Sequence, residues 1–139
     1  MSQENVNVVT GLVAAAKRGD WDAVMESFDP AVELDQSRMP DGGIHRGPSG
    51  MWKFYERWFG SWEEFRFESK GIVEASDGRV VSLVRLSGRG KGSGVQVTMD
   101  SADVYTLRDC KIVQMTGYPD AGEALEAVGL SEEAAHADS

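Results

Sequence analysis

The feature that most constrains this chain is a change in apolar periodicity at Trp62. Before Trp62, apolar side chains recur at helical spacing in three stretches. After it, they alternate with polar side chains along most of the sequence as far as Tyr118. Helical spacing is typical of amphipathic helices, and alternation with period two is typical of half-buried strands. Helices followed by a run of long strands predict one domain with an α+β architecture.

The predicted order is two helices, a short strand, a third helix, four long strands and a last helix. Gly19 ends the first helix, Asp20 caps the second, and Pro48 suits the first turn of the third. Glycine-containing turns separate the first three long strands, and Asp109-Cys110 forms the turn before the last one. The predicted strands cover residues 31–35, 64–75, 79–90, 95–108 and 111–118, and the last helix covers 121–128.

Four long strands in a meander, with helices covering one face, predict a strongly curved antiparallel sheet. The glycines at positions 71, 88 and 90 suit the bends and bulges of such a sheet. A curved sheet closed by helices leaves a hollow between the two layers, which predicts a cone-shaped fold enclosing a pocket. The glycine-rich segment 88–94 lacks the helix that follows a phosphate loop, so a hairpin is the better interpretation.

Composition and charge exclude several classes of function. The net charge is −9, and six acids with no Lys or Arg follow from Asp120 onward, so nucleic acid is an unfavourable partner. We expect residues 131–139 to be an acidic, disordered tail after a domain spanning 1–130. Without a secretory signal or a long apolar run, we expect a cytoplasmic protein that does not bind membranes. Cys110 is the single cysteine, which excludes an internal disulfide.

Four local strings occur in an order that resembles the NTF2-like superfamily, in particular its SnoaL-like and ketosteroid-isomerase-like branch. They read RGDWDA at 18–23, FDPAVE at 28–33, IHRG at 44–47 leading into Phe54 and Tyr55, and VYTLRDCKIV at 104–113. The resemblance covers residues 1 to about 130 and implies the cone-shaped fold. It does not fix the function, because proteins of one fold carry many activities.

Asp103 is the principal candidate for chemistry. In the predicted strand 95–108 it lies on the more apolar of the two faces, which should line the pocket. A carboxyl group there is costly unless it is hydrogen-bonded or protonated. Asp103 matches the aspartate that donates to the substrate oxyanion in ketosteroid isomerases, an established example of a protonated acid. The alternative is a structural role, in which Asp103 pairs with Arg85 or with a backbone amide.

The resemblance also shows what is missing for a steroid isomerase. Leu34 occupies the position of the family's catalytic base, and Leu12 matches its first-helix tyrosine, so this mechanism is disfavoured. Tyr55 matches a pocket tyrosine, and His45 lies near the expected pocket mouth as a second candidate for acid–base catalysis. The expected ligand-binding residues are Leu12, Leu34, Trp52, Tyr55, Trp58, Met99, Tyr105 and Tyr118. No metal-ligand spacing is present, so we expect neither metal nor cofactor.

The hypothesis from sequence is a SnoaL-like protein whose pocket binds a small hydrophobic molecule. It is either a cofactor-independent cyclase, isomerase or hydrolase using acid–base chemistry at Asp103, or a non-catalytic binding or association module. We expect a homodimer paired through the second face of the sheet, around Thr98, Asp100, Ala102 and Val104. A regulatory subunit of a larger enzyme is a third class.

Overall fold

The computed structural model describes residues 2–39 and 42–130, so the predicted acidic tail lies outside the described residues. The secondary-structure elements follow the predicted order, with one added short strand. They are α1 (Ser2–Lys17), α2 (Trp21–Glu26), β1 (Phe28–Asp35), β2 (Ile44–Arg46), α3 (Gly47–Gly60), β3 (Trp62–Glu74), β4 (Val80–Gly90), β5 (Gln96–Arg108), β6 (Lys111–Tyr118) and α4 (Ala121–Ala127). The α+β class predicted from the sequence is confirmed.

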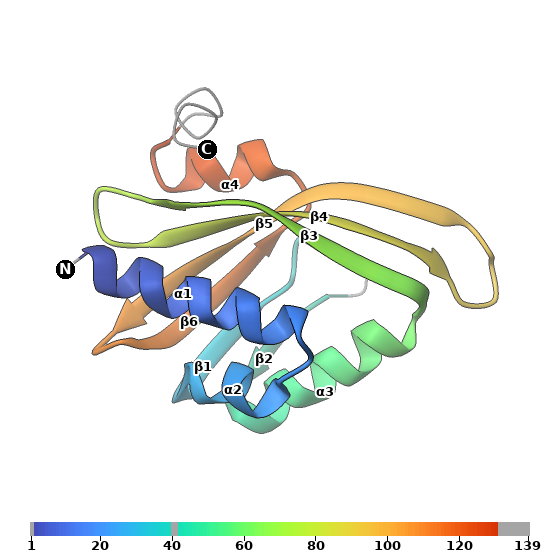
Figure 1. The fold of residues 1–139 in the computed structure, drawn as a ribbon, viewed down its shortest axis with the longest axis horizontal. Coiled ribbons are helices and arrows are strands. Elements are labelled where there is room, and N and C mark those ends of the chain that lie inside the picture. Colours follow the sequence, from blue (N-terminus) through green and yellow to red (C-terminus); the bar gives the residue numbers. More distant parts are fainter. Residues whose placement is uncertain (1, 40–41, 131–139) are drawn as a thin grey trace.

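Both short helices begin where the sequence predicts, whereas β1 begins at Phe28, three residues before the predicted strand 31–35. Asp20 caps α2 by accepting a hydrogen bond from the Ala23 backbone N–H at 3.2 Å, and Asp120 caps α4 in the same way. Gly19, directly after α1, has a φ of +75°, a conformation that glycine adopts without strain. The chain turns back after α1, so that α2 lies beside it on the same side of the sheet (Figure 1).

The six strands form one sheet in the order β2-β1-β6-β5-β4-β3. All neighbouring strands are antiparallel except β1 and β6, which run parallel, so the expected fully antiparallel sheet has one parallel pairing. Strand β2 was expected as loop because it spans three residues beside Gly42 and Gly43. The parallel pairing brings the end of β1 beside the end of β6, and both ends reach the same part of the pocket.

The long strands curve, and α1, α2 and α3 lie on the concave side, which we call the inner face (Figure 1). Breaks in the β3–β4 register fall between Glu63 and Arg66 and between Ser69 and Gly71. Each break adds residues to one strand only, which bends that strand and increases its twist. The main hydrophobic core lies between this inner face and the three helices, with Val9, Val32 and Met51 fully buried.

Helix α4 lies on the opposite, outer face and builds a second, smaller core there (Figure 1). Ala124 and Leu125 of α4 pack over Ala102 and Val104 of β5, which are 1% and 5% exposed. Two of the four residues expected in the dimer surface are therefore covered by α4 of the same chain. Thr98 and Asp100, beyond the reach of α4, are exposed.

Candidate functional site

A cavity of about 140 Å³ lies between the inner face of the sheet and helices α1 to α3. Its walls are largely apolar, and α3 contributes four aromatic rings on the helical side, from Phe54, Tyr55, Trp58 and Phe59. These rings contact one another, for example Phe54 and Trp58, whose centroids lie 6.2 Å apart. Aromatic walls of this kind favour flat, apolar ligands.

The polar groups of the cavity come mainly from the sheet, with Asp103 at the centre. Asp103 opposes Ser82 of β4 on one side and Gly117 of β6 on the other. Its carboxyl makes no hydrogen bond or ion pair with another described residue. Burial raises the pKa of Asp103 from 3.8 to about 7, because the charged form loses the solvation of bulk water. Asp103 is therefore about half ionised near neutral pH.

Arg85, the partner considered for Asp103, pairs elsewhere. Its guanidinium donates to both carboxylate oxygens of Asp100, at 2.7 and 3.2 Å, on the exposed outer face. The strand alternation explains this difference, since Arg85 opposes Asp100 whereas Ser82 opposes Asp103. The interpretation in which Arg85 neutralises Asp103 is wrong.

Two tyrosines share the cavity with Asp103. Burial, together with the charge of Asp103, raises the pKa of both Tyr55 and Tyr105 well above the ordinary value. Both phenols consequently stay protonated at neutral pH and can donate hydrogen bonds. The Tyr55 hydroxyl lies 3.8 Å from the Met115 sulfur, a weak acceptor that leaves this donor available for a ligand.

Sequence reasoning did not select three buried polar residues of the cavity wall, which are Gln36, Ser82 and Ser101. Strand alternation carries a signal for each of them. Ser101 shares a face with Asp103, Ser82 lies between Val80 and Val84 on an apolar face, and Gln36 continues the alternation of Val32 and Leu34.

The structure brings five of the expected ligand-binding residues to the cavity wall, namely Leu12, Tyr55, Trp58, Tyr105 and Tyr118. The Tyr118 ring also lies under the guanidinium of Arg38, 4.9 Å from ring centroid to Cζ. Met99 lines a separate hollow of about 10 Å³ beside Trp58.

The other expected residues lie elsewhere. Leu34 is 0% exposed in the main core, where it pairs with Met115 across the parallel strands. Trp52 is 43% exposed on the side of α3 that faces solvent. Trp52 was difficult to place from the sequence because α3 is aromatic on more than one side.

His45 lies on β2, opposite Leu34, and does not line the cavity among the described residues. Its ring packs against Phe54, with centroids 5.2 Å apart, and its buried Nε2 has no hydrogen-bond partner among the described residues. Burial, followed by the positive charge of Arg57, lowers the pKa of His45. Phe54, which His45 contacts, lines the cavity, whereas His45 itself does not.

Two further observations concern metal binding and membrane crossing. Within residues 2–39 and 42–130, no group of three or more His, Cys, Asp or Glu side chains is arranged to hold a metal ion. None of the described helices is both long enough and apolar enough to cross a membrane.

Comparison with solved structures shows the fold. An NTF2-like protein from Burkholderia thailandensis shares 24% identity with a TM-score of 0.77, over 88% of this chain and 95% of that one. TerC, co-crystallised with polyporic acid, shares 21% identity with a TM-score of 0.71, over 90% and 97%. A Catenulispora acidiphila protein with a ketosteroid isomerase-like fold, in complex with trimethylamine, shares 18% identity with a TM-score of 0.68, over 91% and 95%.

A search of curated proteins gave no match. The model of the SnoaL-like domain, in contrast, matches residues 9–115. The matched segment runs from α1 to β6 and includes the cavity residues Leu12, Tyr55, Asp103 and Tyr105. This chain belongs to the SnoaL-like domain family.

Proposed function

We propose that the cavity binds a small hydrophobic molecule and that Asp103 exchanges a proton with it. The protein is then a cofactor-independent cyclase, isomerase or hydrolase that works by acid–base chemistry. One observation carries this proposal: the Asp103 carboxyl lies in an apolar cavity without a partner among the described residues, and burial raises its pKa to about 7. A catalytic acid or base is most effective when its pKa lies near the working pH.

The groups around Asp103 support a proton transfer next to a carbonyl group. The carboxylate form can remove a proton from carbon, and the acid form can return one. Tyr55 and Tyr105 are held protonated and can donate hydrogen bonds to the oxygen on which negative charge develops. Tyr118, at the cavity wall, orients the ligand.

The cavity volume limits the size of the buried part of the ligand. An engineered apolar cavity of about 150 Å³ accepts benzene. The cavity of about 140 Å³ therefore fits a body of one aromatic ring with a small substituent, and the rest of a larger ligand extends outward.

A non-catalytic binding module is the second candidate, and one observation favours it. By the resemblance to ketosteroid isomerases, Leu12 and Leu34 match two of the positions that carry catalytic groups there, and both side chains are apolar and buried. The described cavity wall offers Asp103 as its one carboxyl, without a second acid or a histidine beside it.

Deuterium exchange at the methyl group of acetophenone in D₂O separates the two candidates. We expect the wild-type protein to accelerate exchange, with a rate that rises through pH 7 as the Asp103 carboxylate forms. Asp103→Asn should lower the rate by roughly 10² or more, the usual contribution of a positioned acid or base. Asp100→Asn, which changes an aspartate on the outer face of the same strand, is the matched control and should leave the rate unchanged.

Two outcomes would contradict the catalytic proposal. The first is exchange no faster than in buffer while acetophenone still binds, which would leave the non-catalytic module. The second is an exchange rate that Asp103→Asn does not change.

We also retain the homodimer as a proposal, restricted to the part of the outer face that α4 leaves exposed around Thr98 and Asp100. Sedimentation velocity across a range of protein concentrations tests it. A single species of monomer mass at all concentrations would contradict it.

A further inference from the structure

Gln36 is a buried polar side chain to which the proposed chemistry assigns no role. It follows β1 directly, is 4% exposed and lines the cavity. Its backbone is fixed, because its N–H donates to the Gly43 carbonyl at 2.7 Å and its carbonyl accepts from the Met39 N–H at 2.9 Å. Its carboxamide, however, makes no hydrogen bond with another described residue. Because Gln36 lines the cavity, its amide is available to a hydrogen-bond acceptor or donor that a ligand supplies.

Gly117 makes room for this carboxamide. A Cβ atom at position 117 would lie 2.4 Å from the Oε1 atom and 2.7 Å from the Nε2 atom of Gln36. Any side chain at position 117 would therefore displace the amide. The carboxamide occupies the place on the inner face that a side chain of residue 117 would otherwise fill.

That place is next to Asp103, because Asp103 and Gly117 oppose each other across β5 and β6. Cβ positions of directly opposed residues lie about 4.5–5.5 Å apart on the same face of a sheet. The Gln36 carboxamide and the Asp103 carboxyl thus lie side by side, and Ser82 continues the polar row on the other side of Asp103. The two unpartnered groups face the same part of the cavity.

We propose that the Gln36 carboxamide donates a hydrogen bond to the carbonyl oxygen of the ligand beside Asp103, so that Gln36 determines specificity for neutral carbonyl compounds. The inference rests on the proposed small-molecule function. A carbonyl oxygen has two lone pairs, so it can accept from the amide N–H and from a tyrosine hydroxyl, while Asp103 serves the proton transfer at carbon. None of the described residues of the cavity wall is Lys, Arg or His, so an anionic ligand would lack a counter-charge.

The rival ligand class is an organic ammonium ion, which aromatic rings and an ionised Asp103 would attract. Three probes of similar size separate these classes, and each is measured at pH 6 and at pH 8, so that a largely protonated and a largely ionised Asp103 are both tested. They are acetophenone, ethylbenzene and phenyltrimethylammonium, with binding measured by calorimetry. For bound acetophenone, the carbonyl stretching band reports hydrogen bonding directly.

We expect wild-type protein to bind acetophenone and ethylbenzene and to shift the carbonyl band to lower wavenumber. Gln36→Leu should reduce the preference for acetophenone over ethylbenzene roughly 3- to 10-fold, as expected for one lost hydrogen bond, and reverse part of the band shift. Gly117→Ala should have the same effect with Gln36 intact, since the new methyl group displaces the amide. Gln96→Leu, at an exposed glutamine that begins β5, is the matched control and should change neither quantity.

Binding of ethylbenzene by each variant verifies that its cavity is intact. An unchanged preference and band in Gln36→Leu would overturn the inference, as would tighter binding of phenyltrimethylammonium than of acetophenone. Both results leave the proposed function standing, because deuterium exchange tests that separately. If the wild-type protein binds none of the three probes, the proposed function fails, and this inference fails with it.

Discussion

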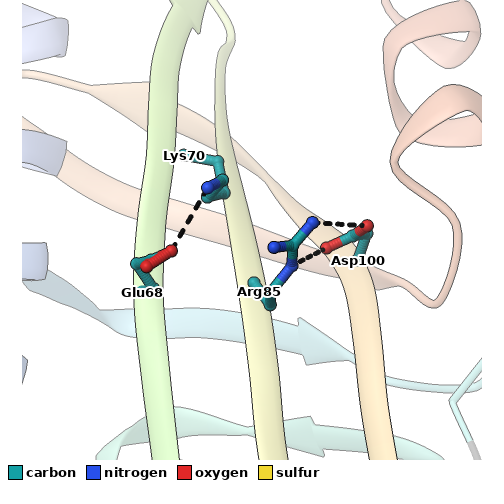
Figure 2. Close-up of polar contacts among 4 residues, drawn as sticks. All are labelled: Glu68, Lys70, Arg85 and Asp100. Carbon is teal, nitrogen blue, oxygen red and sulfur yellow. Dashed lines mark hydrogen bonds and ion pairs between the residues drawn. The ribbon is translucent and has the colours of Figure 1, made fainter.

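Asp100 and Asp103 lie three residues apart on one strand, and the two faces of the sheet give them opposite properties. On the outer face, Arg85 donates two hydrogen bonds to Asp100 and lowers its pKa (Figure 2). On the inner face, Asp103 has no described partner, and burial raises its pKa to about 7. The environment of each carboxyl, and not its place in the sequence, determines which one can exchange protons near neutral pH.

The charges of the outer face also compensate one another across strands. Figure 2 shows Lys70 beside Glu68 on β3 and Arg85 beside Asp100, with each ion pair exposed to solvent. Glu68, Arg85 and Asp100 lie in register on three neighbouring strands. Exposed pairs of this kind contribute little to stability, so we assign this surface to solubility and to the proposed association.

The largest expected effect is on the pH dependence of stability. The pKa of Asp103 is higher in the folded state than in the unfolded chain, so its contribution to stability is complete below about pH 4. It is lost as the pH rises to 7, by about 4 kcal/mol at 1.36 kcal/mol per pKa unit. Asp103→Asn, which has no such charge, should lose none of this stability.

Urea unfolding of both proteins from pH 4 to pH 9 measures this difference. The free energy of unfolding of Asp103→Asn should exceed that of wild type increasingly as the pH rises to about 7, and by a constant amount above it. If the free energies of unfolding of the two proteins changed in parallel with pH, the raised pKa of Asp103 would be contradicted.

On the outer face, the effect of the Arg85–Asp100 ion pair on stability should be much smaller. A double-mutant cycle of Arg85→Ala and Asp100→Ala should show coupling that changes the melting temperature by no more than about 3–4 °C. The coupling should disappear in 1 M NaCl, where the screening length falls to about 3 Å. Coupling that persists in high salt would show that this pair is shielded from solvent and would remove the contrast between the faces.

The sequence predicted most of the fold because alternation and turn signals are local. The predicted strand 111–118 agrees with β6, and the predicted 95–108 differs from β5 by one residue. Cys110 lies in the expected turn between them, with a φ of +63°. The parallel pairing of β1 with β6 depends on contacts between distant segments, which a local pattern does not encode. Strand β2 has only three residues, too few for alternation to be recognised.

The candidate site was predictable to the extent that strand alternation determines it. Alternation places Asp103 and Tyr105 on the inner face, where the structure has them. Gln36 continues the alternation of β1, but the space for its carboxamide depends on the absence of a side chain at Gly117, 81 positions later in the chain. That dependence is not visible in a local pattern. Trp52 was misjudged for a related reason, since the orientation of α3 depends on which aromatic face packs against the sheet.

The central claim is that the inner face holds a carboxyl that titrates near neutral pH. Carbon-13 NMR of the aspartate side-chain carboxyls, with Asp103→Asn and Asp100→Asn to assign the signals, tests it most directly. We expect a pKa of about 7 for Asp103 and a pKa below 3.8 for Asp100. A titration of Asp103 near 3.8, like that of an aspartate in water, would contradict it.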